Sequence, residues 1–232
     1  NVANADFSFI GGGQLNSITL FGPNSVIGGG SSNGLTGSFN FIGGGEGNGI
    51  TGEYSVVVGG QDNFVNTDNG FVGGGESNSV NAQYGTIVGG FTNTTTDTAP
   101  RSFIGAGRTN TISDNDSFIG GGESNSVTSD HSAIVGGQTN SVTGSFSFIG
   151  TGFQNKVWNP VSSVVGGFNN GVTGNYSAIV GGDDNIITGN NSFIGAGATN
   201  FAYGNGCGII AGSSNGITGE LSAIAGGLQN KI

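Results

Sequence analysis

The sequence predicts an all-β fold, a parallel β-solenoid (β-roll) in which fifteen coils of about fifteen residues form a single continuous array over residues 1–232. Three observations predict it. A motif of the form Ser-Phe-Ile-Gly-Gly-Gly recurs along the whole chain, at most steps every 15 residues. The apolar positions of this motif hold mainly β-branched and aromatic residues, which favour strands. Glycine accounts for 51 of the 232 residues and recurs at fixed positions of the motif, as expected for turns.

The repeats align in one register when each is numbered from column 1 to column 15, with Ser117 to His131 as the reference repeat. Two repeats carry two additional residues, near residues 21–23 and 99–101. Column 3 is always Ile or Val, column 6 is always Gly, and column 9 is always Asn. The chain begins and ends inside a repeat, so the sequence is interpreted as an array cut mid-repeat at both ends. It is then either a piece of a longer array or a subunit that stacks end to end.

The columns predict the elements of each coil in order. Columns 1 to 4 are expected to form one short strand, and columns 10 to 12 a second, because their apolar residues are mostly β-branched. Glycine at column 6 is expected to provide a turn with positive φ. The structural turn glycines of five central repeats are Gly122, Gly137, Gly152, Gly167 and Gly182. At about 4.8 Å between neighbouring strands, fifteen coils would make a rod of roughly 70 Å.

Asparagine at column 9 predicts a ladder. Asn tolerates the left-handed αL region and can bond its own backbone, and stacked Asn side chains can bond one another from coil to coil. The ladder residues of the same five repeats are Asn125, Asn140, Asn155, Asn170 and Asn185.

Columns 2 and 4 predict a contact surface between chains. Seven repeats have Phe at column 2, and all seven have Gly at column 4. These residues are Phe9, Phe41, Phe71, Phe103, Phe118, Phe148 and Phe193. Where column 2 is small, column 4 is usually large, as in Ala133 with Val135. Such a trade in volume matters only under tight packing. Because column 3 on the opposite strand face is also apolar, both faces are expected to be covered, which predicts a homo-oligomer. The alternative is a wide solenoid interior with an unusually apolar surface.

Composition excludes several classes of function. The chain has 4 basic and 14 acidic residues, a formal net charge of −10, which disfavours nucleic-acid binding. One Cys and one His cannot build a closed zinc site or a disulfide framework. No apolar run is long enough to cross a bilayer as a helix, so membrane insertion is not expected. No cofactor is expected either.

Isolated reactive residues are interpreted as structural. His131 lies in a variable turn column with no recurring nucleophile, so no catalytic role is predicted. Cys207 occupies the Ser column as a small replacement. Glu46, Glu76 and Glu123 share column 7 and are read as solvated turn acids rather than a cation site. Possible glycosylation sequons begin at Asn93, Asn115, Asn175 and Asn190, of which the last three are the plausible surface acceptors.

The unit Asn140-Ser-Val-Thr-Gly-Ser-Phe-Ser147-Phe-Ile-Gly resembles the head repeat of the trimeric autotransporter adhesins, the YadA-like family. Similar units begin at Asn33 and Asn215. The resemblance implies left-handed parallel β-rolls, three chains about one axis, that bind host matrix or cells. The family unit is commonly shorter, and none of residues 1–232 is expected to form the family's neck, stalk or anchor. Glycine-rich solenoids of this kind also occur in phage tail fibres and other extracellular fibres.

The sequence therefore predicts a non-enzymatic structural protein, extracellular or on a cell or virion surface, that assembles with itself into a filament or surface fibre and has an adhesive role. The alternative is an adhesin head or phage tail-fibre module that binds glycan or matrix. Ice binding is a third candidate, because flat Thr arrays on β-solenoids can order water. However, Asn66, Asn81, Ser113, Trp158 and Tyr203 interrupt the Thr residues of column 12.

Overall fold

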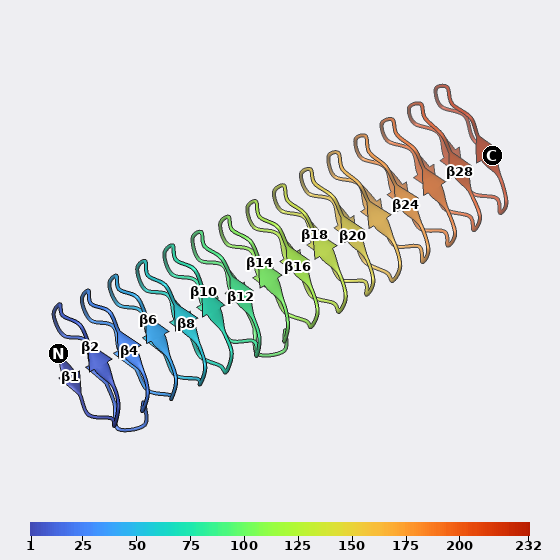
Figure 1. Ribbon diagram of the computed structural model, residues 1–232. Coiled ribbons are helices and arrows are strands. Elements are labelled where there is room, and N and C mark those ends of the chain that lie inside the picture. The colour runs from blue at the N-terminus through green and yellow to red at the C-terminus, as the bar shows by residue number, and fades with distance from the viewer. The chain divides into compact units, whose positions relative to one another are not determined.

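The computed structural model describes residues 1–232 and contains only strands, turns and bends. It divides into two compact units, unit 1 (Asn1–Asp116) and unit 2 (Ser117–Ile232). In each unit the chain winds into stacked coils whose strands pair in parallel, as Figure 1 shows. The all-β parallel solenoid of about fifteen turns predicted from the repeat is confirmed.

Unit 1 contains strands β1 to β15, and alternate strands belong to two parallel sheets. The sheet A strands are β1 (Val2–Ala3), β3 (Ser17–Ile18), β5 (Gly34–Leu35), β7 (Gly49–Ile50), β9 (Phe64–Val65), β11 (Ser79–Val80), β13 (Thr94–Thr95) and β15 (Thr111–Ile112). The sheet B strands are β2 (Phe9–Ile10), β4 (Val26–Ile27), β6 (Phe41–Ile42), β8 (Val56–Val57), β10 (Phe71–Val72), β12 (Thr86–Ile87) and β14 (Phe103–Ile104).

Unit 2 contains strands β16 to β30 in the same alternation. The sheet A strands are β17 (Ser126–Val127), β19 (Ser141–Val142), β21 (Lys156–Val157), β23 (Gly171–Val172), β25 (Ile186–Ile187), β27 (Phe201–Ala202) and β29 (Gly216–Ile217). The sheet B strands are β16 (Phe118–Ile119), β18 (Ala133–Ile134), β20 (Phe148–Ile149), β22 (Ser163–Val164), β24 (Ala178–Ile179), β26 (Phe193–Ile194), β28 (Gly208–Ile209) and β30 (Ala223–Ile224).

Residues of the same column pair between neighbouring coils. Ile134 lies opposite Ile149 in sheet B, and Ile10 lies opposite Ile27 across a repeat that carries two additional residues. The two additional residues are thus accommodated in a turn, and the stacking register is kept. Every column consequently forms a row of equivalent residues along each unit.

The strands are shorter than predicted. Only columns 2–3 and 10–11 pair as strands, because the chain turns on both sides of each pair. The ladder of main-chain hydrogen bonds nevertheless reaches columns 4 and 12. The Gly136 N–H donates to the Gly150 carbonyl at 3.1 Å, and the Thr128 N–H donates to the Val142 carbonyl at 2.9 Å. A third row of parallel bridges, at column 7, was not predicted and runs from Gln14 to Phe91 and on to Arg108 in unit 1.

The core of each unit is a narrow double row of aliphatic side chains. Column 3 residues such as Ile134 from sheet B and column 11 residues such as Val142 from sheet A have no exposed surface. Each coil therefore contributes about two apolar side chains to the core. Their burial alone is too small to offset the conformational entropy that fifteen residues lose when they become ordered. Beside this double row, the buried residues of columns 1 and 9 are mainly Ser and Asn, respectively.

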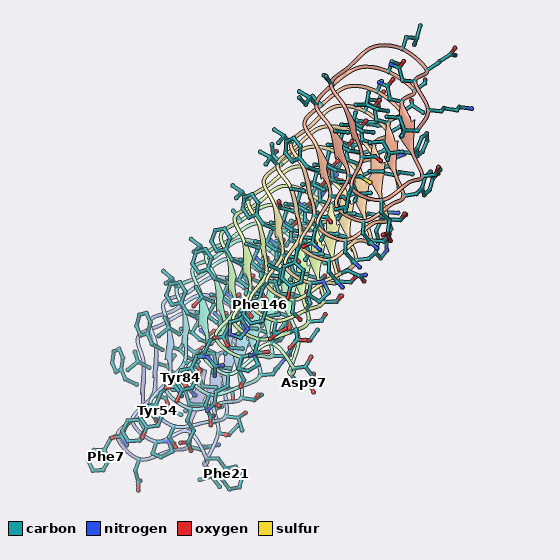
Figure 2. All side chains as sticks on the ribbon, turned by 90° about the vertical axis from the view of Figure 1, so that its right-hand side faces the viewer. Phe7, Phe21, Tyr54, Tyr84, Asp97 and Phe146 are labelled. Carbon is teal, nitrogen blue, oxygen red and sulfur yellow. The ribbon has the colours of Figure 1, made fainter.

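The two longer repeats form projecting turns. Phe21 in the first is largely exposed, and both Phe21 and Asp97 point away from the ribbon in Figure 2. The second turn is held by Arg101, whose guanidinium donates to both carboxylate oxygens of Asp116 at 2.6 and 2.7 Å. This ion pair raises the pKa of Arg101 through its hydrogen bond and charge interaction with Asp116.

Candidate assembly interface

The column 6 glycines occupy a backbone conformation that other residues rarely reach. The φ angles of Gly122, Gly137, Gly152, Gly167 and Gly182 are 92, 92, 106, 100 and 96°. These values exceed the αL range near +50 to +70° that an L-residue can adopt. In addition, a Cβ atom at Gly182 would overlap the carbonyl oxygen of Gly197 in the next coil. Glycine is required here both for its φ and for the close approach of two coils.

The column 9 asparagines form a buried ladder of hydrogen bonds. Asn140 Nδ2 donates to the Gly136 carbonyl of its own coil at 3.1 Å and to the Gly152 carbonyl of the next coil at 2.9 Å. Its Oδ1 accepts from the main-chain N–H of Asn155 at 2.9 Å. The same bonds recur at Asn170 and Asn185. Each Asn thus satisfies the polar groups of the glycine turn, and no other side chain has both an acceptor and two donors in this shape.

The αL conformation expected at column 9 occurs instead at columns 8 and 15. None of the column 9 asparagines has a positive φ, whereas Ser124 and Thr139 at column 8 have φ of 54 and 57°. The reason is that column 9 must point its side chain inward to the carbonyl groups of two coils, while the turn before it reverses the chain.

Serine at column 1 forms a second buried ladder that sequence analysis missed. Ser162 Oγ accepts from the Ser177 N–H at 3.2 Å and donates to the Gly174 carbonyl at 2.8 Å. Cys207 continues the row, with its buried Sγ 3.1 Å from the Gly219 carbonyl. The recurrence of Ser at column 1 was a usable signal, because a hydroxyl can both accept and donate along a row.

Columns 2 and 4 point away from the core and form the outer surface of sheet B. The seven column 2 phenylalanines, Phe9, Phe41, Phe71, Phe103, Phe118, Phe148 and Phe193, are all half-buried or exposed. Val135 and Val180 at column 4 are about half exposed. The structure therefore brings the predicted interface residues together on one face of each unit, and within a single chain that face is open to solvent.

The trade of volume between columns 2 and 4 has a direct geometric cause. The ring of Phe148 bends over Gly150 of its own coil, so that a Cβ at Gly150 would lie 3.5 Å from Phe148 Cε1. The same relation holds between Phe193 and Gly195, at 3.4 Å. A Cβ at Gly150 would also overlap the Val165 carbonyl oxygen of the next coil, so the backbone there and the ring together exclude a larger side chain at column 4.

Acidic residues are absent from both sheet faces. All 14 acidic residues lie in the turn columns 7, 8 and 13 to 15 or in the longer turns. Columns 2 and 4 contain no charged residue in any repeat. The outer face of sheet B is consequently an uncharged apolar strip on a chain of net charge −10.

A row of exposed side chains in the αL conformation runs along column 15. Tyr54 and Tyr84 have φ of 55 and 59°, unusual for large aromatic residues, and Phe39 stacks on Tyr54 with ring centroids 4.9 Å apart. Figure 2 shows Phe7, Tyr54 and Tyr84 in one line along unit 1. The varied residues at this column gave no signal for αL in the sequence.

His131 belongs to this row and makes local contacts. Its Nδ1 lies 2.9 Å from Asp130 Oδ2, and its ring stacks on Phe146 at 4.8 Å. Hydrogen bonds from Ser145 and then from His131 lower the pKa of Asp130. These contacts explain why a histidine and an acid occupy adjacent turn positions.

The sequons differ in accessibility. Asn93 is fully buried in the ladder, and its Nδ2 donates to Asn78 Oδ1 and to the carbonyl groups of Gly89 and Gly107. The folded protein thus leaves no free amide there for a glycan, and the assignment of Asn93 as an acceptor is corrected. Asn190 is exposed and Asn115 and Asn175 are half-buried at turns. The three remaining candidate acceptors all lie at column 14, apart from the sheet B face.

No known protein family and no curated protein matches this chain. The structure contains no helix with the length and apolar character needed to cross a bilayer.

Proposed function

We propose that this chain is a non-enzymatic structural protein that assembles with further copies of itself through the outer face of sheet B, as part of an extracellular or surface-displayed fibre. The single observation that supports this most is the uncharged apolar strip of columns 2 and 4. A strip of phenylalanine and valine side chains that is open to solvent on an isolated chain is typical of a surface that another protein covers.

A second copy of this chain is the partner that fits the strip. The rows of the strip repeat at the spacing of neighbouring strands, about 4.8 Å, and only a surface with the same repeat stays in register with them over many coils. The distribution of charge also favours it. Two chains of net charge −10 repel unless their acids lie away from the contact, and here all acids lie in the turns.

The test compares two triple variants of unit 2 by sedimentation velocity. Phe118→Ser/Phe148→Ser/Phe193→Ser removes rings from the strip, and Ser163 shows that a coil already accepts serine at column 2. Phe146→Ser/Phe153→Ser/Phe168→Ser removes three rings outside it, of which Phe146 and Phe168 are exposed and Phe153 is half-buried. We expect the native chain and the second variant to self-associate and the first to be monomeric with unchanged circular dichroism. A monomeric native chain, or equal association of both variants, would contradict the proposal.

Electron microscopy of the native particle separates a fibre from a binding head. Long filaments of uniform width support the fibre. Discrete short oligomers favour the alternative, a head like those of the adhesins that the repeat resembles.

A further inference from the structure

The outer face of sheet A in unit 2 carries two hollows built from the same columns. The first, of about 210 Å³, lies between Trp158, Gly171 and Ile186. The second lies between Tyr203, Gly216 and Lys231 and is also lined by Ile232, the last residue of the sequence. Neither hollow touches the strip on sheet B, so the inference drawn from them is independent of the proposed self-assembly.

Both hollows have an aromatic residue at column 12 followed by Gly and Thr in the next coil. Trp158 precedes Gly171 at column 10 and Thr173 at column 12, and Tyr203 stands in the same relation to Gly216 and Thr218. In the first hollow the glycine is needed for close approach, since a Cβ at Gly171 would lie 3.0 Å from Trp158 Cζ3. Glycine therefore forms the base of each hollow, and one large aromatic ring forms its side.

A neighbour at column 10 of the same coil supports each ring. Lys156 Nζ lies 5.9 Å from the centre of the Trp158 ring, and Phe201 stacks on Tyr203 with centroids also 5.9 Å apart. Both aromatic side chains remain about half exposed. The two rings are thus held in place with part of their surface open to a ligand.

The electrostatics of this face favour an anionic ligand. The only two lysines of the chain, Lys156 and Lys231, line the two hollows. No acidic residue occupies columns 9 to 12 in any repeat, and Asp184, which bonds Asn169 at the rim of the first hollow, lies at column 8. A carboxylate that reaches either hollow meets a positive charge beside an aromatic surface.

The hollows fit sugar rings better than a peptide. The N–H groups of Gly171 and Gly216 already donate to the carbonyls of Asn185 and Asn230, and the Thr173 and Thr218 hydroxyls donate to main-chain carbonyls at 3.3 and 3.1 Å. An added peptide strand would find no free backbone edge on this face. The oxygen of each threonine hydroxyl can still accept a hydrogen bond from a sugar hydroxyl.

We propose that unit 2 binds an acidic polysaccharide along the outer face of sheet A. The C–H faces of two sugar rings pack on Trp158 and Tyr203, Lys156 and Lys231 donate to sugar carboxylates, and Thr173 and Thr218 accept from sugar hydroxyls. The two hollows are three coils apart, about 14 Å at the usual strand spacing, so one chain of linked sugars can fill both.

Trp158 is the only tryptophan, so its fluorescence reports the first hollow directly. The probe is a homogeneous oligogalacturonate added to the full chain, with neutral maltohexaose and polyglutamate as comparisons. We expect a saturable change in fluorescence with oligogalacturonate that weakens as salt is added. No saturable change would overturn the proposal. An equal response to maltohexaose would refute the role of the lysines, and an equal response to polyglutamate would refute the preference for sugar.

Variants locate the site. Lys156→Gln should weaken oligogalacturonate binding about tenfold, since one charge-assisted hydrogen bond is lost. Trp158→Ala, followed by calorimetry, should weaken it at least as much. The matched control is Phe64→Ala, which removes an exposed ring of sheet A in unit 1 that has no lysine beside it. Equal affinity of all three variants would contradict the assignment. Repeating the titration with the monomeric triple variant of the sheet B strip keeps this test separate from self-assembly.

Discussion

The Oδ1 atom of Asn63 accepts two hydrogen bonds from Asn78 in the next coil, one from its main-chain N–H and one from its side-chain amide, each 3.0 Å long. At the same time, Asn63 Nδ2 donates to the carbonyl groups of Gly59 and Gly75 at 3.1 and 2.9 Å. One buried side chain thus links three segments of backbone.

We expect Asn63→Ala to lower the free energy of unfolding by about 3 kcal/mol, because it leaves the Gly59 carbonyl and the Asn78 N–H without their partner in the interior and removes one of the two hydrogen bonds to the Gly75 carbonyl. Urea denaturation followed by circular dichroism measures the change. The control is Asn66→Ala, three residues along, where the side chain is exposed and makes one outer hydrogen bond to Asn81. Similar losses in both variants would show that the ladder contributes little to stability.

Two adjacent glycines test the requirement at column 6. Gly182 has φ of 96°, and an added Cβ would overlap the backbone of the next coil, whereas a Cβ at Gly181 meets nothing within 4 Å. Gly182→Ala should therefore cost about 3 kcal/mol or more in thermal or urea unfolding, and Gly181→Ala about 1 kcal/mol or less. If Gly182→Ala unfolds at the same urea concentration as the native chain, the invariance of column 6 needs another explanation.

The contact between Phe148 and Gly150 predicts a coupled pair. Gly150→Val should destabilise the protein by about 2 kcal/mol, since its Cβ overlaps the Val165 carbonyl oxygen of the next coil and its methyl groups enter the space of the Phe148 ring. Adding Phe148→Ala recreates the Ala–Val combination of Ala133 and Val135 and should recover about 1 kcal/mol of that loss. A double-mutant cycle from urea denaturation measures this coupling. Strict additivity would mean that the two columns vary independently.

The pair Asp130 and His131 predicts a dependence on pH. Because hydrogen bonds from Ser145 and His131 lower the pKa of Asp130 in the folded protein, the carboxylate adds stability above its unfolded value of about 3.8. That contribution is lost as the pH falls through the lower folded value. The stability difference between the native chain and Asp130→Asn should therefore shrink as the pH drops below about 4.

Titration of the Asp130 carboxyl by NMR provides the direct readout. Ser145→Ala removes the largest cause of the shift, so the pKa of Asp130 should rise toward its ordinary value in that variant. An unchanged titration in Ser145→Ala would rule out this hydrogen bond as the cause.

Part of this structure follows from the sequence because the same residue recurs in every coil. When equivalent residues stack on one another, a local rule such as Gly at column 6 or Asn at column 9 is repeated along a whole row. The period, the parallel strands, the rows of Ile and Val and the buried Asn ladder could all be predicted in this way. The serine ladder could have been predicted by the same reasoning.

Other features depend on contacts that no single repeat contains. In most coils columns 2 and 3 are both apolar, so only the packing of two sheets decided that Ile149 lies inside and Phe148 outside. The αL turns at columns 8 and 15 hold residues as different as Tyr54 and Ser124, because stacking of neighbouring coils imposes the φ there.

The hollows on sheet A are the clearest example of a feature that a single repeat does not predict. Trp158 and Gly171 are separated by almost one full repeat in the chain and come into contact only when two coils lie side by side. The sequence by itself determined the coil and its period, since these arise from identical residues paired with one another. The tertiary structure decided which faces are open and what they present, because those surfaces are formed by unlike residues from neighbouring coils.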